Sequence, residues 1–77
     1  MILPAQMRMA RAGLGWSLSD LATKAEINPN TLSRYERGRD VLAGKLLKVE
    51  LVLRAHGVTF SDEGDRLSVS IPIDKVG

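Results

Sequence analysis

The sequence predicts a mostly α-helical bundle followed by a C-terminal β-hairpin. Apolar residues recur at three- or four-residue spacing in four stretches of residues 3–56, which is helical spacing. Only three of the 77 residues are aromatic, so the core must be built from aliphatic side chains. After residue 57 the pattern changes to polar–apolar alternation around a Gly-containing turn, which is typical of a hairpin. We expect residues 1–57 to form one helical domain and residues 58–77 a hairpin tail.

A first helix is predicted from Pro4 to about Ala12. Proline suits the first position of a helix, and Gly13 and Gly15 follow the periodic stretch. Trp16 is expected to anchor the next helix to the core. The buried side of the first helix is expected to hold Leu3, Met7, Ala10 and Leu14.

Two short helices joined by a tight turn are predicted between Ser17 and Gly38. Ser17, followed three residues later by Asp20, has the pattern of a capped helix start. Asn28 before Pro29 predicts the next start, because Asn accepts hydrogen bonds from free N–H groups and proline fits the first position. Gly38 is expected to end this helix in the left-handed conformation. The apolar side of the first short helix is Leu18, Leu21, Ala22 and Ala25.

Residues 28–37 divide into two sides when placed at about 100° per residue. The inward side is expected to hold Leu32, Tyr35 and Glu36, and the outward side Asn30, Ser33, Arg34 and Arg37. Such a polar stripe is often only a solvated face. Asn and Arg can, however, bond bidentately with adenine and guanine in the major groove, which accepts a helix of this size. The capped helix and turn that precede the stripe favour this second interpretation, a DNA-binding helix-turn-helix.

The run LGWSLSDLATKAEINPNTLSRYERGR resembles the helix-turn-helix of the Xre/Cro-type phage repressor family. The residues that carry the resemblance are Leu21, Ala22, Ile27, Leu32, Tyr35, Glu36 and Gly38. It extends over about residues 5 to 60. The resemblance implies a lambda-repressor-like helical bundle that binds double-stranded DNA and regulates transcription, with repression as the expected mode.

Two positions depart from the family pattern. Relatives usually carry Gly in the turn where this chain has Glu26, which would cost under about 1 to 2 kcal/mol if the position requires a positive φ. Many relatives carry Gln at the position of Leu18 for a phosphate contact. Ser17 or Ser19 would have to make that contact here.

The candidate DNA contacts follow from these observations. Bases would be read by Asn30, Ser33 and Arg34, with Thr31 at the edge of the groove. The resemblance implies phosphate contacts at Arg39 and Lys45. Arg37 and the Ser17 end of the second helix would make further phosphate contacts. It also implies a structural ion pair between Arg11 and Glu36, since a lone inward carboxylate is costly.

Charge is unevenly spread along the chain. Residues 1–48 hold eight basic and four acidic residues, a net charge of +4, and residues 49–77 hold three and five, a net charge of −2. A basic helical half suits phosphate contact, although such an excess is equally compatible with ordinary solvation. An acidic tail is not expected to lie on DNA.

A last helix is predicted from Gly44 to His56, closed by Gly57. Its buried line is Leu46, Val49 and Leu53. Leu47 and Leu51 form a second apolar line about 100° away, which is more than a four-helix core needs. We expect the tail or a partner chain to cover it.

The hairpin is predicted from alternating residues on either side of the turn at residues 62–65. Its apolar residues are Val58, Phe60, Leu67, Val69 and Ile71. Because a lone hairpin is marginally stable, it should pack on Leu47 and Leu51 or pair with a strand of a second chain. We expect a homodimer that forms through this tail, residues 58–77. Pro72 should end the second strand, and residues 74–77 should form a frayed end.

Several classes of function are not expected. The chain has no cysteine, which removes disulfides and thiolate metal sites and is compatible with a cytoplasmic location. We expect no membrane segment, because the N-terminal apolar run is too short. His56 is the one histidine and has no catalytic partner in sequence, so we expect no enzyme activity, metal or cofactor. The alternative function is an antitoxin-like or adaptor module that binds a protein through residues 44–56 and the hairpin.

Overall fold

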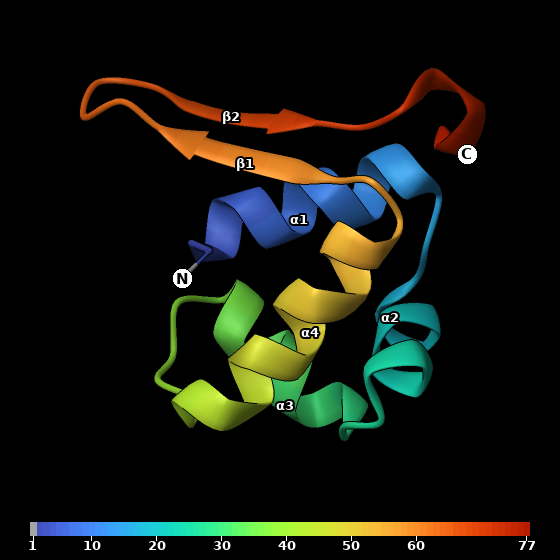
Figure 1. The fold of residues 1–77 in the computed structure, drawn as a ribbon. Helices are drawn as coiled ribbons and strands as arrows, with labels where there is room; N and C mark the ends of the chain where they lie inside the picture. Colours follow the sequence, from blue (N-terminus) through green and yellow to red (C-terminus); the bar gives the residue numbers. More distant parts are fainter. Residues whose placement is uncertain (1) are drawn as a thin grey trace.

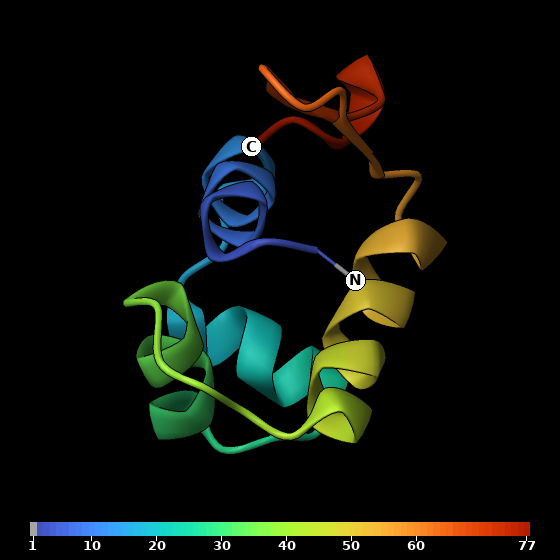
Figure 2. The same ribbon diagram turned by 90° about the vertical axis from the view of Figure 1, so that its left-hand side faces the viewer.

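The structure, a computed structural model, describes residues 2–77, which form a helical bundle followed by a two-stranded antiparallel hairpin. The elements in order are α1 (Pro4–Leu14), α2 (Leu18–Ala25), α3 (Pro29–Glu36), α4 (Ala43–Ala55), β1 (Thr59–Asp62), β2 (Leu67–Ser70) and a short 3-10 helix (Ile73–Lys75). The hairpin lies over α1, at the end of the molecule opposite α3 (Figures 1 and 2). The predicted fold class is therefore confirmed.

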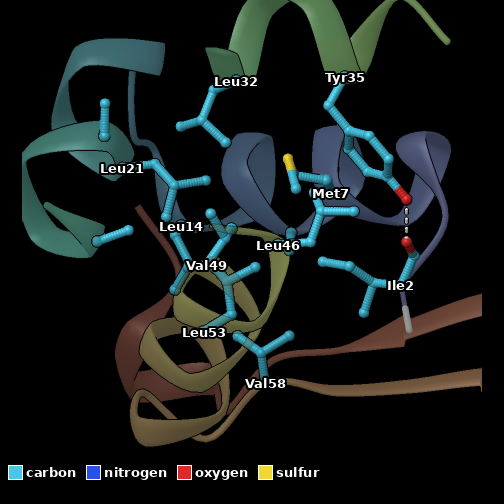
Figure 3. Close-up of a cluster of buried hydrophobic side chains, with 13 residues drawn as sticks. Ile2, Met7, Leu14, Leu21, Leu32, Tyr35, Leu46, Val49, Leu53 and Val58 are labelled. Atoms are coloured by element: carbon cyan, nitrogen blue, oxygen red, sulfur yellow. Dashed lines mark hydrogen bonds between the residues drawn. The ribbon is translucent and has the colours of Figure 1, made fainter. Parts of the chain in front are cut away.

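Each helix contributes aliphatic side chains to one core (Figure 3). Met7 of α1, Leu21 of α2, Leu32 of α3 and Leu53 of α4 are each 1% exposed or less. Val58, which follows α4, is buried against the same cluster. The helical periodicity predicted these positions because side chains three and four residues apart share a face.

The start of α1 differs from the prediction. Leu3 is 41% exposed, whereas Gln6 is only 3% exposed. The backbone N–H of Leu3 donates to Gln6 Oε1 at 2.9 Å, and Gln6 Nε2 donates to the carbonyl of Ser61 at 3.0 Å. Because both ends of the amide are bonded, a polar side chain takes a buried position. The helix also continues past Ala12 to Leu14 and ends at Gly15, whose φ is 73°.

The hairpin packs on α1 and leaves the outer side of α4 uncovered. Leu47 and Leu51 are 55% and 57% exposed, so of the two covers expected for them, the tail or a partner chain, the tail is excluded. Gly57, with φ at 86°, turns the chain after α4 so that both strands run above α1 (Figure 1). A Cβ on Gly13 would lie 2.3 Å from Ile71 Cδ1, which shows how closely the tail approaches this helix.

The C-terminal residues are held rather than frayed, which corrects a second expectation about the tail. The N–H of Gly77 donates to the carbonyl of Gly13 at 3.0 Å, and Ile73–Lys75 forms the 3-10 helix. The two residues that make this contact, Gly13 and Gly77, are 64 positions apart in the sequence. Local composition therefore gave no signal for it.

Candidate nucleic-acid interface

The start of α2 is fixed by reciprocal hydrogen bonds between Ser17 and Asp20. The N–H of Asp20 donates to Ser17 Oγ at 3.0 Å, and the N–H of Ser17 donates to Asp20 Oδ2 at 2.8 Å. The bond from the Ser17 backbone, followed by the bond from its side chain, lowers the pKa of Asp20 below its usual value. The predicted capping box is confirmed, and it places Ser17 and Ser19 at the exposed N-terminal end of α2.

The turn between α2 and α3 is made by a left-handed residue. Glu26 has φ 57° and ψ 46°, and its N–H donates to the carbonyl of Thr23 at 3.2 Å. Ile27 is half-buried, and its N–H donates to the carbonyl of Ala22 at 3.0 Å. A non-glycine residue in this conformation costs under about 1 to 2 kcal/mol. Glu26 therefore keeps the turn geometry that glycine would adopt without strain.

The start and inward side of α3 are fixed by polar contacts as well as by packing. Asn28 Oδ1 accepts the N–H of Asn30 at 2.8 Å, and Pro29 occupies the first helical position, as predicted. The Tyr35 hydroxyl donates to the carbonyl of Ile2 (Figure 3). Burial raises the pKa of Tyr35. Since Leu32 is also buried, one whole side of α3 is anchored to the core.

An ion pair ties α1 to the end of α3. Arg11 Nε and Nη2 each lie 2.9 Å from a carboxylate oxygen of Glu36, which is only 6% exposed. Arg11 Nη1 also donates to the carbonyl of Trp16 at 3.1 Å, and Arg8 donates to the backbone carbonyl of Glu36. The hydrogen bond with Glu36 raises the pKa of Arg11. Together with the buried Leu32 and Tyr35, this bidentate pair keeps one side of α3 turned toward α1 and the core.

The outward side of α3 presents the predicted reading residues. Asn30, Arg34 and Arg37 are exposed, and Thr31 and Ser33 are half-buried. Within residues 2–77 the side chains of Asn30 and Arg34 make no hydrogen bond to protein, so their donors and acceptors are available to a ligand. Arg37 Nε donates to the carbonyl of Ser33 at 3.3 Å, which holds Arg37 along the last turn of α3.

A shallow groove of about 340 Å³ separates α3 from the start of α4. Its lining residues are Thr31, Arg34, Asp40, Val41, Leu42 and Lys45. The groove brings together Arg34, predicted to read bases, and Lys45, predicted to contact phosphate. Asp40, Val41 and Leu42 were not named as candidate contacts, although the loop that holds them lies between the candidates Arg39 and Lys45. Their sequence carried no motif, and only the course of the loop places them beside α3.

Gly38 and Arg39 follow the C-terminal end of α3. Gly38 has φ 87°, and the N–H of Arg39 donates to the carbonyl of Arg34 at 3.0 Å, so the helix ends as predicted. Arg39 is exposed, but it does not line the groove with Lys45. The two candidate phosphate contacts therefore lie on different parts of the same surface.

Other kinds of site were sought among residues 2–77. No group of three or more His, Cys, Asp or Glu side chains in that range could hold a metal ion. No helix in that range is long and apolar enough to cross a membrane. His56 packs edge-on against Trp16, with ring centroids 4.8 Å apart, and its Nδ1 donates to the carbonyl of Val52 at 2.9 Å. His56 therefore has a structural role at the end of α4.

Comparison with known proteins agrees with this geometry. Residues 3–67 match a family model described as a helix-turn-helix domain. The match covers well over half of the chain and includes all four helices and β1. No curated protein matches the chain.

Proposed function

The chain belongs to the helix-turn-helix domain family, and on that premise we propose that it is a sequence-specific DNA-binding regulator of transcription. Its α3 enters the major groove, which accepts a helix of this size. The observation that carries the proposal is the division of α3 into two sides. Leu32, Tyr35 and Glu36 are fixed inward, while Asn30 and Arg34 are exposed with unbonded side chains.

The residues take distinct roles in this proposal. Asn30 pairs with adenine, Arg34 pairs with guanine, and Ser33 and Thr31 make looser contacts at the edge of the groove. Phosphates are held by Ser17, Ser19, Arg37, Arg39 and Lys45. Phosphate contacts set the position of the protein on DNA, and base contacts set the sequence that it selects. Arg34 and Lys45 line one groove, which supports joint contact with a base and the adjacent backbone.

The regulator is proposed to be of the Xre/Cro type and to repress by covering its operator. The resemblance of residues 14–39 to that family supports the type, and repression is the mode that the same resemblance implies. The same proposal makes the protein a homodimer. Its operator is then a pseudo-palindrome with half-sites about one helical turn apart.

The substitution Arg34→Ala tests the base-reading role. We expect the free energy of operator binding to weaken by about 1 to 3 kcal/mol, which is on the order of a 5- to 150-fold loss of affinity, because a bidentate arginine–guanine contact is lost. Fluorescence anisotropy on an operator selected from a random DNA pool measures the change. Arg66→Ala removes the same charge near the hairpin turn, opposite α3, and should change affinity far less. Equal losses in the two variants would contradict a specific role for Arg34.

A protein-interaction module, antitoxin-like or adaptor, is the second candidate function. It is favoured by Leu47 and Leu51, which stay more than half exposed on α4. A salt titration of DNA binding separates the two candidates. A regulator that contacts several phosphates loses affinity steeply as salt rises, whereas an interaction module shows little DNA binding at any salt concentration.

A further inference from the structure

One acidic side chain lies among the candidate DNA contacts. Asp40 belongs to the loop that crosses from the end of α3 to the start of α4 (Figure 2). Between positions 27 and 49 the sequence has two acidic residues, Glu36 and Asp40. Glu36 is buried and paired with Arg11, whereas Asp40 is exposed. The carboxylate of Asp40 is therefore the one in this segment that a ligand can reach.

Asp40 shares the groove beside α3 with Arg34, the residue proposed to read guanine. Both side chains line this space of about 340 Å³, and Lys45 lines it from α4. Asp40 and Arg34 do not satisfy each other. Within residues 2–77 neither side chain is hydrogen-bonded, and the ion pairs of that range join α1 to α3 or lie within α4. A guanidinium and a carboxylate thus line one groove with their bonding groups free.

A free carboxylate at a DNA interface has few favourable contacts. It repels the phosphates near it, so it weakens binding to DNA of any sequence. The groups that it attracts are N–H donors, which in the major groove are the amino groups at N4 of cytosine and N6 of adenine. Adenine also presents the acceptor N7 beside its amino group, and that acceptor repels a carboxylate oxygen. Cytosine is therefore the base that the Asp40 carboxylate fits best.

The major-groove edge of one G·C pair matches both side chains together. Guanine presents two acceptors, N7 and O6, and cytosine presents the donor N4 next to O6. Arg34 can supply two N–H donors from its planar guanidinium, and Asp40 can supply an acceptor. An A·T pair presents its donor between two acceptors and does not match this order. On a G·C pair the guanidinium and the carboxylate would also offset each other's charge.

We propose that Asp40 is a specificity-determining residue that accepts a hydrogen bond from N4 of the cytosine paired with the guanine read by Arg34. The inference deepens the proposed function and rests on it. Asp40 then acts in two opposite ways. It strengthens binding to an operator that has this G·C pair, and it weakens binding to other DNA, where the carboxylate repels phosphate without a bond in return.

Selection of bound DNA from a random pool, followed by fluorescence anisotropy, tests this role. The wild type should select a G·C pair at the position that Arg34→Ala relaxes. Asp40→Ala should lower the ratio of operator affinity to random-DNA affinity by roughly 5- to 150-fold. It should also bind random DNA more tightly than the wild type does at the same salt concentration, because a charge that repels phosphate is gone.

Asp65→Ala is the matched control, since it removes an exposed carboxylate at the hairpin turn, away from α3 (Figure 1). Asp65→Ala should keep the wild-type ratio of operator affinity to random-DNA affinity. Far-UV circular dichroism should show the same helix content in the wild type and in both aspartate variants.

A modified operator tests the contact itself. N4-methylcytosine still pairs with guanine, but its methyl group replaces the N–H that faces the major groove. Placed opposite the guanine read by Arg34, it should lower wild-type affinity by roughly 5- to 150-fold. It should cost Asp40→Ala much less, because that variant has no carboxylate to lose the bond. The comparison of the two proteins separates the lost hydrogen bond from the bulk of the methyl group.

Two results would overturn the inference and leave the proposed function standing. One is an Asp40→Ala variant that selects the same base pair with the wild-type ratio of affinities. The other is an equal loss from N4-methylcytosine in the wild type and in Asp40→Ala. A wild-type chain that selects no sequence from the pool would contradict the proposed function, and this inference with it.

Discussion

The helices α3 and α4 both bury one side and expose the other, but their exposed sides differ in chemistry. The outward side of α3 is polar, with Asn30, Arg34 and Arg37 exposed. The outward side of α4 presents Leu47 and Leu51, which the hairpin does not reach. Water forms hydrogen bonds with the polar side of α3, so exposure of that side costs little free energy. Removing the apolar side of α4 from water lowers the free energy.

This difference separates two kinds of evidence for binding. A polar exposed side is compatible with solvent alone, so the case for α3 depends on how firmly its inner side fixes Asn30 and Arg34. Exposed leucines bind by leaving water, so the case for α4 as a contact surface depends on the apolar area that a partner would cover. The following substitutions act on these two helices or on elements packed against them.

The largest effect is expected from the inner side of α4. Leu53→Ala should lower the free energy of unfolding by about 2 to 5 kcal/mol, because it leaves a cavity in the core. Leu51→Ala is the same chemical change on the exposed side of α4 and should cost about 0.5 kcal/mol or less. Urea unfolding followed by Trp16 fluorescence measures both. Similar losses would mean that Leu51 is packed within the monomer.

A smaller effect is expected from the ion pair that orients α3. Arg11→Met should lower the free energy of unfolding by about 2 kcal/mol, because it leaves the buried Glu36 carboxylate without its partner. That value allows for the partial exposure of Arg11. The double variant Arg11→Met with Glu36→Gln should recover part of the loss, since no charge is then left unpaired. A double variant less stable than Arg11→Met would contradict this account. Urea unfolding at neutral pH compares the three proteins.

The smallest effect is expected from the capping bonds at the start of α2, the helix that precedes α3. The pKa of Asp20 is lowered in the folded chain, so its carboxylate stabilises the fold above its unfolded pKa, near 3.8. That contribution is lost as the pH falls below this value through the lowered pKa. Asp20→Asn should therefore flatten the acid limb of a stability–pH profile measured by thermal unfolding. An unchanged limb would mean that the capping bond does not persist in solution.

Most of the fold could be predicted because its signals are local. The cap at Ser17, the turn at residues 26–29 and the glycine at position 38 each act on backbone within a few residues, and the structure has all three. Helical spacing also identified Leu21, Leu32 and Leu53 as buried. The left-handed conformation expected at Glu26, from a comparison with relatives that carry glycine there, is present as well.

The errors concern contacts between distant segments. Gln6 is buried because its amide reaches Ser61, and Gly77 is held because it meets Gly13. The groove beside Arg34 depends on the path of the loop at residues 39–42. None of these contacts leaves a periodic pattern, because each depends on where a separate part of the chain comes to lie.

The sequence by itself determined which residues form helices, which sides of them are apolar and where the chain turns, since these follow from side-chain spacing and backbone preference. It also showed that α4 carries more apolar surface than four helices need. Only the tertiary structure decided that the hairpin covers α1 rather than Leu47 and Leu51. Either surface would have buried the apolar side of the strands. In the structure the chain turns at Gly57, Ile71 lies close to Gly13, and Leu47 and Leu51 of α4 stay exposed.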